Sequence, residues 1–157
     1  MTIKQVKIYD MDGTIVCSMH RYRTKSNNGK VAIDLQYWRD NQYKANLDSL
    51  LPLATQYQNE LNNPEIYVII ATARELYQPD IDFINNILGK PNYVISRKHG
   101  DNISGKNLKI NGLKKFFNLK NFKNATFTFY EDNAEYLKAV CDEFKIHGVY
   151  VPSEQGH

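Results

Sequence analysis

Two carboxylates stand two residues apart near the start of the chain, where Asp10-Met11-Asp12-Gly13-Thr14 follows a short apolar run. The run predicts a buried strand that would deliver both acids to the edge of a sheet, and Gly13 would allow a sharp turn there. Paired acids at a strand end suit a hard cation together with nucleophilic or acid–base chemistry. We therefore expect Asp10 and Asp12 to carry catalysis.

Polar side chains also follow two later apolar runs. Thr72 and Arg74 come after the run at 66–71, and Glu131 and Asp132 end the run at 125–130. Each has a simpler interpretation alone, because an acid after a strand can cap a helix. Their repeated position after strands favours one shared site.

The elements that must position these residues alternate between strands and helices. We expect strands at 4–9, 66–71, 92–96, 125–130 and 147–151, and helices at 52–61, 79–88, 107–117 and 133–145. This alternation predicts an α/β fold, a parallel five-stranded sheet with helices on both faces. Ligands of such sheets bind at the carboxyl ends of the strands.

Composition sets the outer limits. The chain has 157 residues, 42% hydrophobic and 24% charged, with a net charge of +3, which predicts a single soluble domain over 1–157. Cys17 and Cys141 lack metal-ligand spacing. No apolar run reaches membrane-spanning length and the N-terminus is polar, so we expect a cytoplasmic protein without a membrane or an obligate protein partner.

The segments at the strand ends, together with a lysine-bearing helix, resemble the four motifs of the haloacid dehalogenase (HAD) superfamily, in order over residues 6–133. The resemblance implies a Rossmann-like HAD fold and a phosphatase. Asp10 would attack phosphorus and form a phospho-aspartate. Asp12 would protonate the leaving oxygen and then deprotonate water. Thr72 would hydrogen-bond a transferring oxygen.

The same resemblance implies Mg²⁺ as the cofactor. Asp10, the backbone carbonyl of Asp12, and Asp132 would be direct ligands, and Glu131 would act through water. Mg²⁺ fits because it keeps several waters and uses few carboxylates beside a phosphate.

The third motif needs a lysine that neutralises the phosphate and the nucleophile. Lys109 is our choice, and Lys106 remains an alternative because it also lies near the start of that helix. Lys98 precedes the helix and suits the role less well.

The chain also resembles the 3′-phosphatase domain of phage-type polynucleotide kinase-phosphatases, which implies a role in nucleic acid repair. Arg21 stands eleven residues after Asp10, and Lys109 stands eight residues after an Arg-x-x-Gly-Asp segment that ends at Asp101. The resemblance implies that Arg21, Arg74, Thr72 and Lys109 bind a polynucleotide 3′-phosphate end.

Three positions depart from that pattern. Gly105 stands where the resembling proteins carry an aspartate, Glu131 replaces the first of two aspartates, and Ala73 replaces a glycine. No kinase half is present, so end-phosphorylating activity is not implied.

The segment between the first two motifs has fewer than sixty residues. We expect a flap at roughly 15–45 and no large cap domain, and therefore a site open to polymer ends. Cations on this flap and over residues 97–123 could track a phosphate backbone. A solvated lysine-rich helix face is the alternative.

Other functions stay open. A HAD phosphatase of small nucleotides or sugar phosphates is the main alternative. Gly100 to Asn107 nearly spells a P-loop, which suggests a nucleotide kinase, although Asn107 replaces the hydroxyl that ligates Mg²⁺. A non-catalytic HAD-fold binding module is a third possibility, against which the intact motif residues argue.

Aromatic residues in the flap have two interpretations. Trp38 is expected to pack in the core or the flap. Base stacking by Trp38, Tyr37 or Tyr22 is the alternative.

Overall fold

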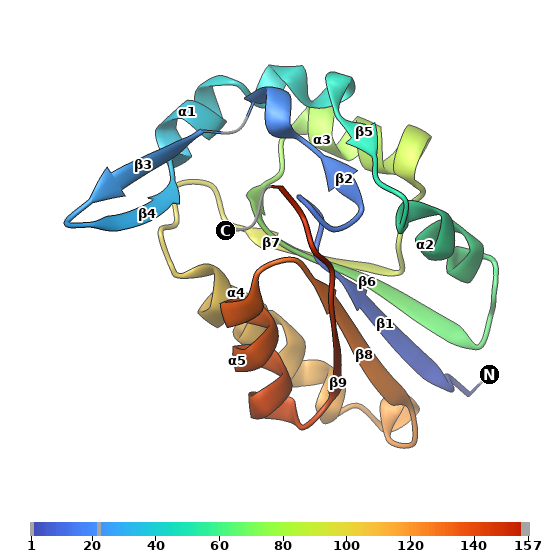
Figure 1. The fold of residues 1–157 in the computed structure, drawn as a ribbon. Helices are drawn as coiled ribbons and strands as arrows, with labels where there is room; N and C mark the ends of the chain where they lie inside the picture. The colour runs from blue at the N-terminus through green and yellow to red at the C-terminus, as the bar shows by residue number, and fades with distance from the viewer. Residues whose placement is uncertain (1, 22, 155–157) are drawn as a thin grey trace.

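The computed structural model describes residues 2–21 and 23–154, and its centre is a parallel five-stranded sheet (Figure 1). In spatial order the strands are β7 (Tyr93–Arg97), β6 (Ile66–Glu75), β1 (Gln5–Tyr9), β8 (Thr126–Glu131) and β9 (His147–Tyr150). The predicted α/β fold with a five-stranded parallel sheet is confirmed.

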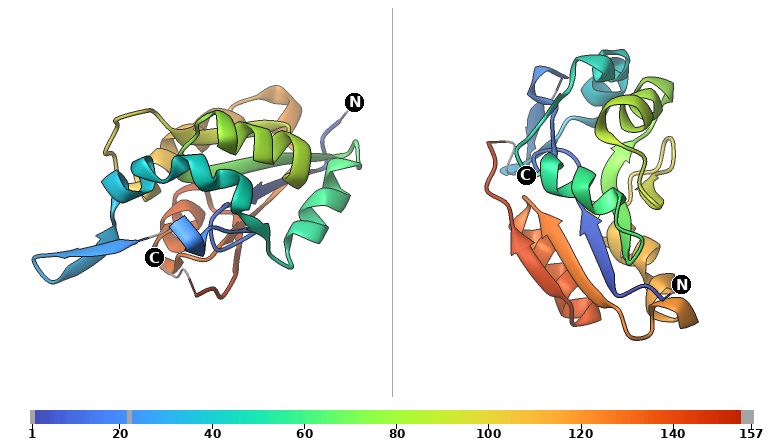
Figure 2. Two further views of the ribbon diagram at one scale, coloured as in Figure 1. Left: turned by 90° about the horizontal axis from the view of Figure 1, so that it is seen from above. Right: turned by 90° about the vertical axis from the view of Figure 1, so that its right-hand side faces the viewer.

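Helices cover both faces of this sheet (Figure 2). One face carries α2 (Ala54–Leu61) and α3 (Gln78–Phe83), which continues as the π-helical segment η3 (Ile84–Leu88). The other face carries α4 (Gly105–Leu113), the 3-10 helices η4 (Lys114–Phe117) and η5 (Lys120–Phe122), and α5 (Ala134–Phe144). Each face has its own core of buried apolar side chains, with β1 contributing Val6 and Ile8 to one and Tyr9 to the other.

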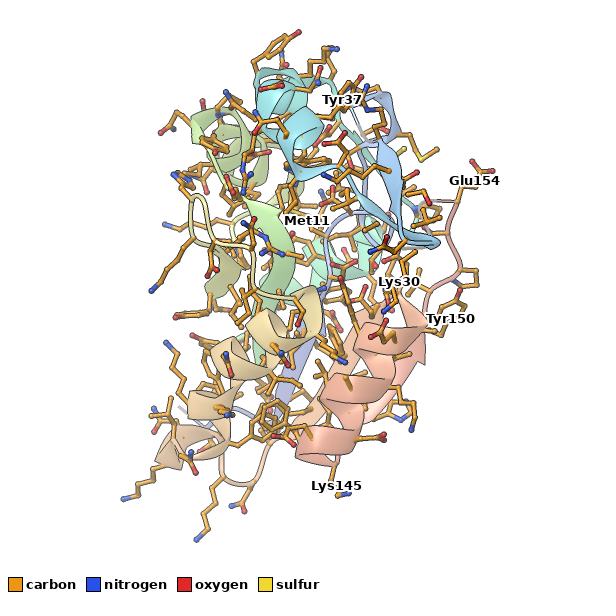
Figure 3. The ribbon with its side chains drawn as sticks, turned by 90° about the vertical axis from the view of Figure 1, so that its left-hand side faces the viewer. Met11, Lys30, Tyr37, Lys145, Tyr150 and Glu154 are labelled. Atoms are coloured by element: carbon orange, nitrogen blue, oxygen red, sulfur yellow. The ribbon has the colours of Figure 1, made fainter. Side chains whose placement is uncertain are left out.

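The register of the sheet brings the predicted site residues to one edge. Tyr9, the last residue of β1, lies opposite Ile70 of β6 and Tyr130 of β8. Asp10 therefore lies at the carboxyl edge of the sheet, between the last residues of β6 and those of β8. In Figure 3, Lys145 at the end of α5 lies at the opposite end of the molecule from Tyr37 on α1 (Leu35–Asp40). α5 begins at Ala134, directly after the predicted site residues Glu131 and Asp132.

We call the segment from Val16 to Leu50, which lies between β1 and α2, the flap; the sequence predicted it at roughly 15–45. It contains α1 and, around it, β2 (Val16–Cys17), η1 (Met19–Arg21), β3 (Thr24–Asn27), β4 (Lys30–Ile33), η2 (Gln42–Leu47) and β5 (Ser49–Leu50). β3 and β4 form a hairpin that projects from the body (Figure 1), and its turn places Asn28 and Gly29 at φ 54° and 78°. Within the described residues the flap builds no large second domain.

Two elements differ from the prediction. β6 runs on to Glu75, and its pairing with β7 shifts register between Ala71 and Glu75. Thr72 and Arg74 therefore lie in a bulge of the strand and not after it, which re-aims their side chains. α4 begins at Gly105, two residues earlier than expected, because Ser104 accepts the N–H of Asn107 as an N-cap.

No helix in the part of the chain that the structure describes combines the length and the apolar character that crossing a membrane requires.

Candidate active site

Asp10 lies at the end of β1 and is paired with a buried lysine. Its Oδ1 accepts from Nζ of Lys109 at 2.8 Å, and its Oδ2 accepts from Oγ1 of Thr14 at 3.0 Å. Lys109 is 1% exposed and also donates to Oε2 of Glu131 at 2.6 Å. The Lys106 side chain is 42% exposed and pairs with Glu135, so the structure brings Lys109 and not Lys106 to Asp10.

The charges around Lys109 fix the protonation of this cluster. Burial opposes ionisation of Asp10, but the Lys109 ammonium and several hydrogen bonds outweigh it and hold the pKa of Asp10 below its usual value. Burial and then the Asp10 charge raise the pKa of Glu131 well above its usual value. Despite burial, the two carboxylates raise the pKa of Lys109. Asp10 therefore stays ionised, as a nucleophile requires.

Three buried acids form a possible cation site. Asp10, Glu131 and Asp132 each offer an oxygen, and these oxygens lie within 4.8 Å of one another. Oε1 of Glu131 already accepts the backbone N–H groups of Asp132 and Asn133, and Oε2 binds Lys109. An all-oxygen set fits a hard cation such as Mg²⁺.

Gly13 is required beside this cluster. Its φ is 83°, and a Cβ there would collide with the Asp132 carboxylate and approach Oγ of Ser153. Ser153 itself donates to Oδ2 of Asp132 at 2.9 Å.

Asp12 is held by Arg74. Nε of Arg74 donates to Oδ2 of Asp12 at 3.1 Å, and Nη2 donates to Oδ1. The same guanidinium donates to Asp80 at 2.7 Å and to Asp48 at 3.2 Å. Arg74 thus fixes the orientation of the Asp12 carboxylate from a fully buried position.

Arg21 belongs to the same buried network. It is 0% exposed and donates to Asp48 at 3.0 and 2.8 Å and to Asp80 at 2.9 Å. The ring of Trp38 lies 4.2 Å from its guanidinium carbon and 4.9 Å from that of Arg74. Arg21 is thus bound to Asp48 and Asp80 and packs on Trp38, and it is not among the residues that line the cavity described next.

Thr72 sits in the β6 bulge, 1% exposed, and its Oγ1 accepts the backbone N–H of Arg74 at 3.1 Å. It lines a cavity of about 60 Å³ in which most of the predicted site residues meet. The lining residues are Asp10, Asp12, Ile33, Leu35, Trp38, Arg39, Thr72, Ala73, Arg74, Glu75, Arg97, Lys109, Glu131 and Tyr136. Four of them belong to the flap, so the site is more covered than the sequence predicted.

The P-loop interpretation finds no support in the geometry. Nη1 of Arg97 donates to the carbonyls of Asp101 at 3.0 Å and Ile103 at 2.6 Å. An arginine side chain therefore fills the loop that a P-loop would wrap around a phosphate. Lys106, its supposed phosphate ligand, points to Glu135.

Several residues in or beside the cavity had no sequence signal. Asp48 and Asp80 belong to no motif. Asp80 stands in the first turn of α3, where its side chain accepts the backbone N–H of Tyr77 as part of the helix cap.

The aromatic residues of the flap pack against arginines. Trp38 is 4% exposed, in line with packing, and Tyr37 packs on Arg23. Tyr22 lies outside the described residues.

Comparisons with known proteins indicate the family and the fold of the chain. A family model described as bacteriophage T5 5′-deoxynucleotidase matches residues 1–145. The 5′-deoxynucleotidase of Escherichia phage T5 is 32% identical over 101 residues, 62% of this chain and 36% of that protein. The chain thus spans about a third of the length of this curated relative.

Solved structures show the same fold at low identity. A chain of the Pnkp1/Rnl/Hen1 RNA repair complex superposes with a TM-score of 0.64 at 17% identity, over 96% of this chain and 43% of that one. The HAD-like hydrolase SP0104 from Streptococcus pneumoniae gives 0.63 at 11% identity, over 97% and 88%. The fold is therefore HAD-like, and the match over residues 1–145 shows that the chain belongs to the bacteriophage T5 5′-deoxynucleotidase family.

Proposed function

We propose that this chain is a Mg²⁺-dependent phosphatase that hydrolyses nucleoside 5′-monophosphates through a phospho-aspartate at Asp10. The observation that carries the proposal is the pairing of Asp10 with buried Lys109 at 2.8 Å, in a cavity that Asp12 and Thr72 also line. The name of the T5 relative, a 5′-deoxynucleotidase, supports deoxynucleotides as the substrate class.

The first step forms a bond between an oxygen of Asp10 and phosphorus. The bond from phosphorus to the 5′-oxygen breaks, and that oxygen takes a proton from Asp12 and leaves as the nucleoside. In the second step a water oxygen attacks phosphorus, Asp12 takes the proton of the water, and phosphate leaves as Asp10 is restored. Lys109 and Thr72 stabilise the charge on the transferring oxygens throughout.

A bound Mg²⁺ would supply charge neutralisation and would orient the phosphate. As the motif resemblance implies, Asp10, Asp132 and the backbone carbonyl of Asp12 would hold it directly, and Glu131 would act through water.

Polynucleotide 3′-phosphate ends are the second candidate, supported by the Arg21 and Gly-Asp spacing of the sequence. Two observations favour mononucleotides. Arg21 is bound to Asp48 and Asp80, and flap residues Ile33, Leu35 and Trp38 line the cavity and cover part of it.

A substrate panel distinguishes the candidates. The purified protein with Mg²⁺ is given deoxy- and ribonucleoside 5′-monophosphates, sugar phosphates, and oligonucleotides that carry a 3′- or a 5′-phosphate. We expect the highest kcat/KM with a deoxynucleoside 5′-monophosphate. A higher kcat/KM with 3′-phosphorylated oligonucleotides would replace this proposal with the second candidate.

A further inference from the structure

Tyr136 lines the cavity, and the proposed chemistry makes no use of it. It lies in the first turn of α5, where its backbone N–H donates to Oδ1 of the N-cap Asn133 at 3.0 Å. Nζ of Lys109 lies 5.2 Å from its ring centroid. The phenol is therefore on the same wall of the cavity as the lysine that contacts Asp10.

Gly105 makes room for this ring. A Cβ at Gly105 would lie 2.5 Å from the Tyr136 hydroxyl oxygen and 2.6 and 2.7 Å from Cζ and Cε2, closer than such atoms can approach. Gly105 stands one turn before Lys109 on α4, and helical side chains lean toward the N-terminus. The phenol and the Lys109 side chain thus meet over the same turn, and the absence of a side chain at 105 is what admits the ring.

The hydroxyl of Tyr136 makes no hydrogen bond to residues 2–21 or 23–154 of the structure, whereas the hydroxyls of the buried Tyr9 and Tyr57 are paired. Tyr57 donates to the carbonyl of Gly89 at 2.5 Å, and Tyr9 contacts Glu60 and Gln56. Partly buried phenols usually find a partner. Burial raises the pKa of Tyr136, so its hydroxyl keeps the proton that it can donate.

We propose that the Tyr136 hydroxyl is a substrate-binding donor, which hydrogen-bonds an oxygen of the phosphoryl group beside Lys109. We choose the phosphoryl group as the partner because the Tyr136 ring packs against the Lys109 ammonium, which would neutralise the phosphoryl charge. The inference rests on the proposed phosphatase function.

Tyr136→Phe removes only the hydroxyl. We expect the dissociation constant of inorganic phosphate, measured calorimetrically with Mg²⁺ present, to rise about tenfold, because a hydrogen bond to a charged group is lost. KM for the nucleotide should rise in parallel. Tm should stay unchanged, since the hydroxyl has no partner in the described protein to lose.

Tyr93→Phe is the matched control, because Tyr93 lies at the start of β7, away from the cavity, and bonds Lys115. It should leave phosphate binding unchanged. Gly105→Ala should also weaken phosphate binding, because the Cβ displaces the Tyr136 ring.

Equal phosphate dissociation constants in wild type and Tyr136→Phe, or no phosphate binding by the wild type, would overturn the inference. A wild type that binds phosphate more tightly than Tyr136→Phe but hydrolyses no nucleotide would support it and reject the proposed function instead.

Discussion

At the scale of single residues, the Arg74 guanidinium contacts acids of the protein itself. Its guanidinium donates through Nε, Nη1 and Nη2 to Asp12, Asp48 and Asp80, so its bonding capacity is directed at carboxylates of the protein. We infer that Arg74 positions Asp12, the proposed general acid. Asp12 must lose this contact in part when it turns to the leaving oxygen.

Arg74→Lys tests this role, because lysine keeps the charge but loses the planar fork that grips Asp12. We expect kcat/KM for a nucleotide to fall by about tenfold to a hundredfold, since protonation of its basic leaving oxygen depends on Asp12. An aryl phosphate with a weakly basic leaving group needs little protonation and should lose much less. Equal losses on both substrates would contradict a positioning role.

The sequence predicted four residues of the cavity because their motifs lie at strand ends or on the helix beside them. Asp10, Asp12, Thr72 and Lys109 line the cavity because their elements deliver them there. Arg21 could not be placed in this way. Its partners Asp48 and Asp80 are 27 and 59 residues away in sequence, and only the packed flap brings them together.

At the scale of elements, the flap is fastened to the core beside the site. Trp38 of α1 packs on the guanidinium groups of Arg21 and Arg74, and Arg39 pairs with Glu75 of β6 at 2.7 Å. The flap thus touches the residue that holds Asp12. We therefore expect that loosening the flap would disturb the orientation of Asp12, because Trp38 packs on Arg74 and Arg74 binds Asp12.

Trp38→Ala should lower the free energy of unfolding by about 3 kcal/mol, because it empties a buried aromatic site and leaves two stacked cations uncovered. Denaturant unfolding measures this change. Tyr37→Ala, which removes a neighbouring ring on a more exposed part of α1, should cost clearly less. Similar losses in both variants would show that Trp38 does not anchor the flap.

Glu75 makes this docking dependent on pH. Burial disfavours its charge, but Arg39, the Tyr77 hydroxyl and the N–H of Gly100 outweigh burial and lower its pKa from 4.5 to about 2. The stabilisation is complete above the unfolded pKa of 4.5 and is lost as the pH falls toward 2. The Tm difference between wild type and Glu75→Gln should therefore shrink between pH 5 and about pH 2.5. A Tm difference that stays constant over this pH range would contradict a stabilising role of the ionised Glu75.

Element types were predictable, but details that depend on packing were not. Ile81, Ile84 and Leu88 stand at helical spacing within the predicted helix 79–88, yet Ile81 is 38% exposed whereas Ile84 and Leu88 are buried. Asp80 turns inward to Arg21 and Arg74, and its neighbour Ile81 lies about 100° farther round the helix. The bulge in β6 was not predictable either, because it depends on how β6 pairs with β7 and the apolar pattern of the strand does not indicate it.

At the scale of the whole molecule, the order of the strands brings together acids from two distant parts of the sequence. Asp10 follows β1, and Glu131 and Asp132 lie at the end of the neighbouring β8. The alternating pattern was enough to predict this convergence. The substrate was not predictable, because it depends on how far the flap covers the cavity.

Chelation tests the cation site that this convergence builds. EDTA should abolish phosphatase activity and Mg²⁺ should restore it, because the buried acids need a cation beside the phosphate. Asp132→Ala should raise the Mg²⁺ concentration for half-maximal activity at least about tenfold. Glu135→Ala, an exposed acid nearby on α5, should leave it unchanged. Full activity after exhaustive chelation would rule out the metal role.

The most direct test of the central claim is to trap the intermediate. The protein is mixed with a deoxynucleoside 5′-monophosphate and Mg²⁺, quenched in acid and reduced with borohydride, which converts a phospho-aspartate to homoserine. Peptide mass spectrometry should find homoserine at position 10, and none in Asp10→Asn or without nucleotide. Turnover of the nucleotide without modification at position 10, or modification of another residue, would contradict the account.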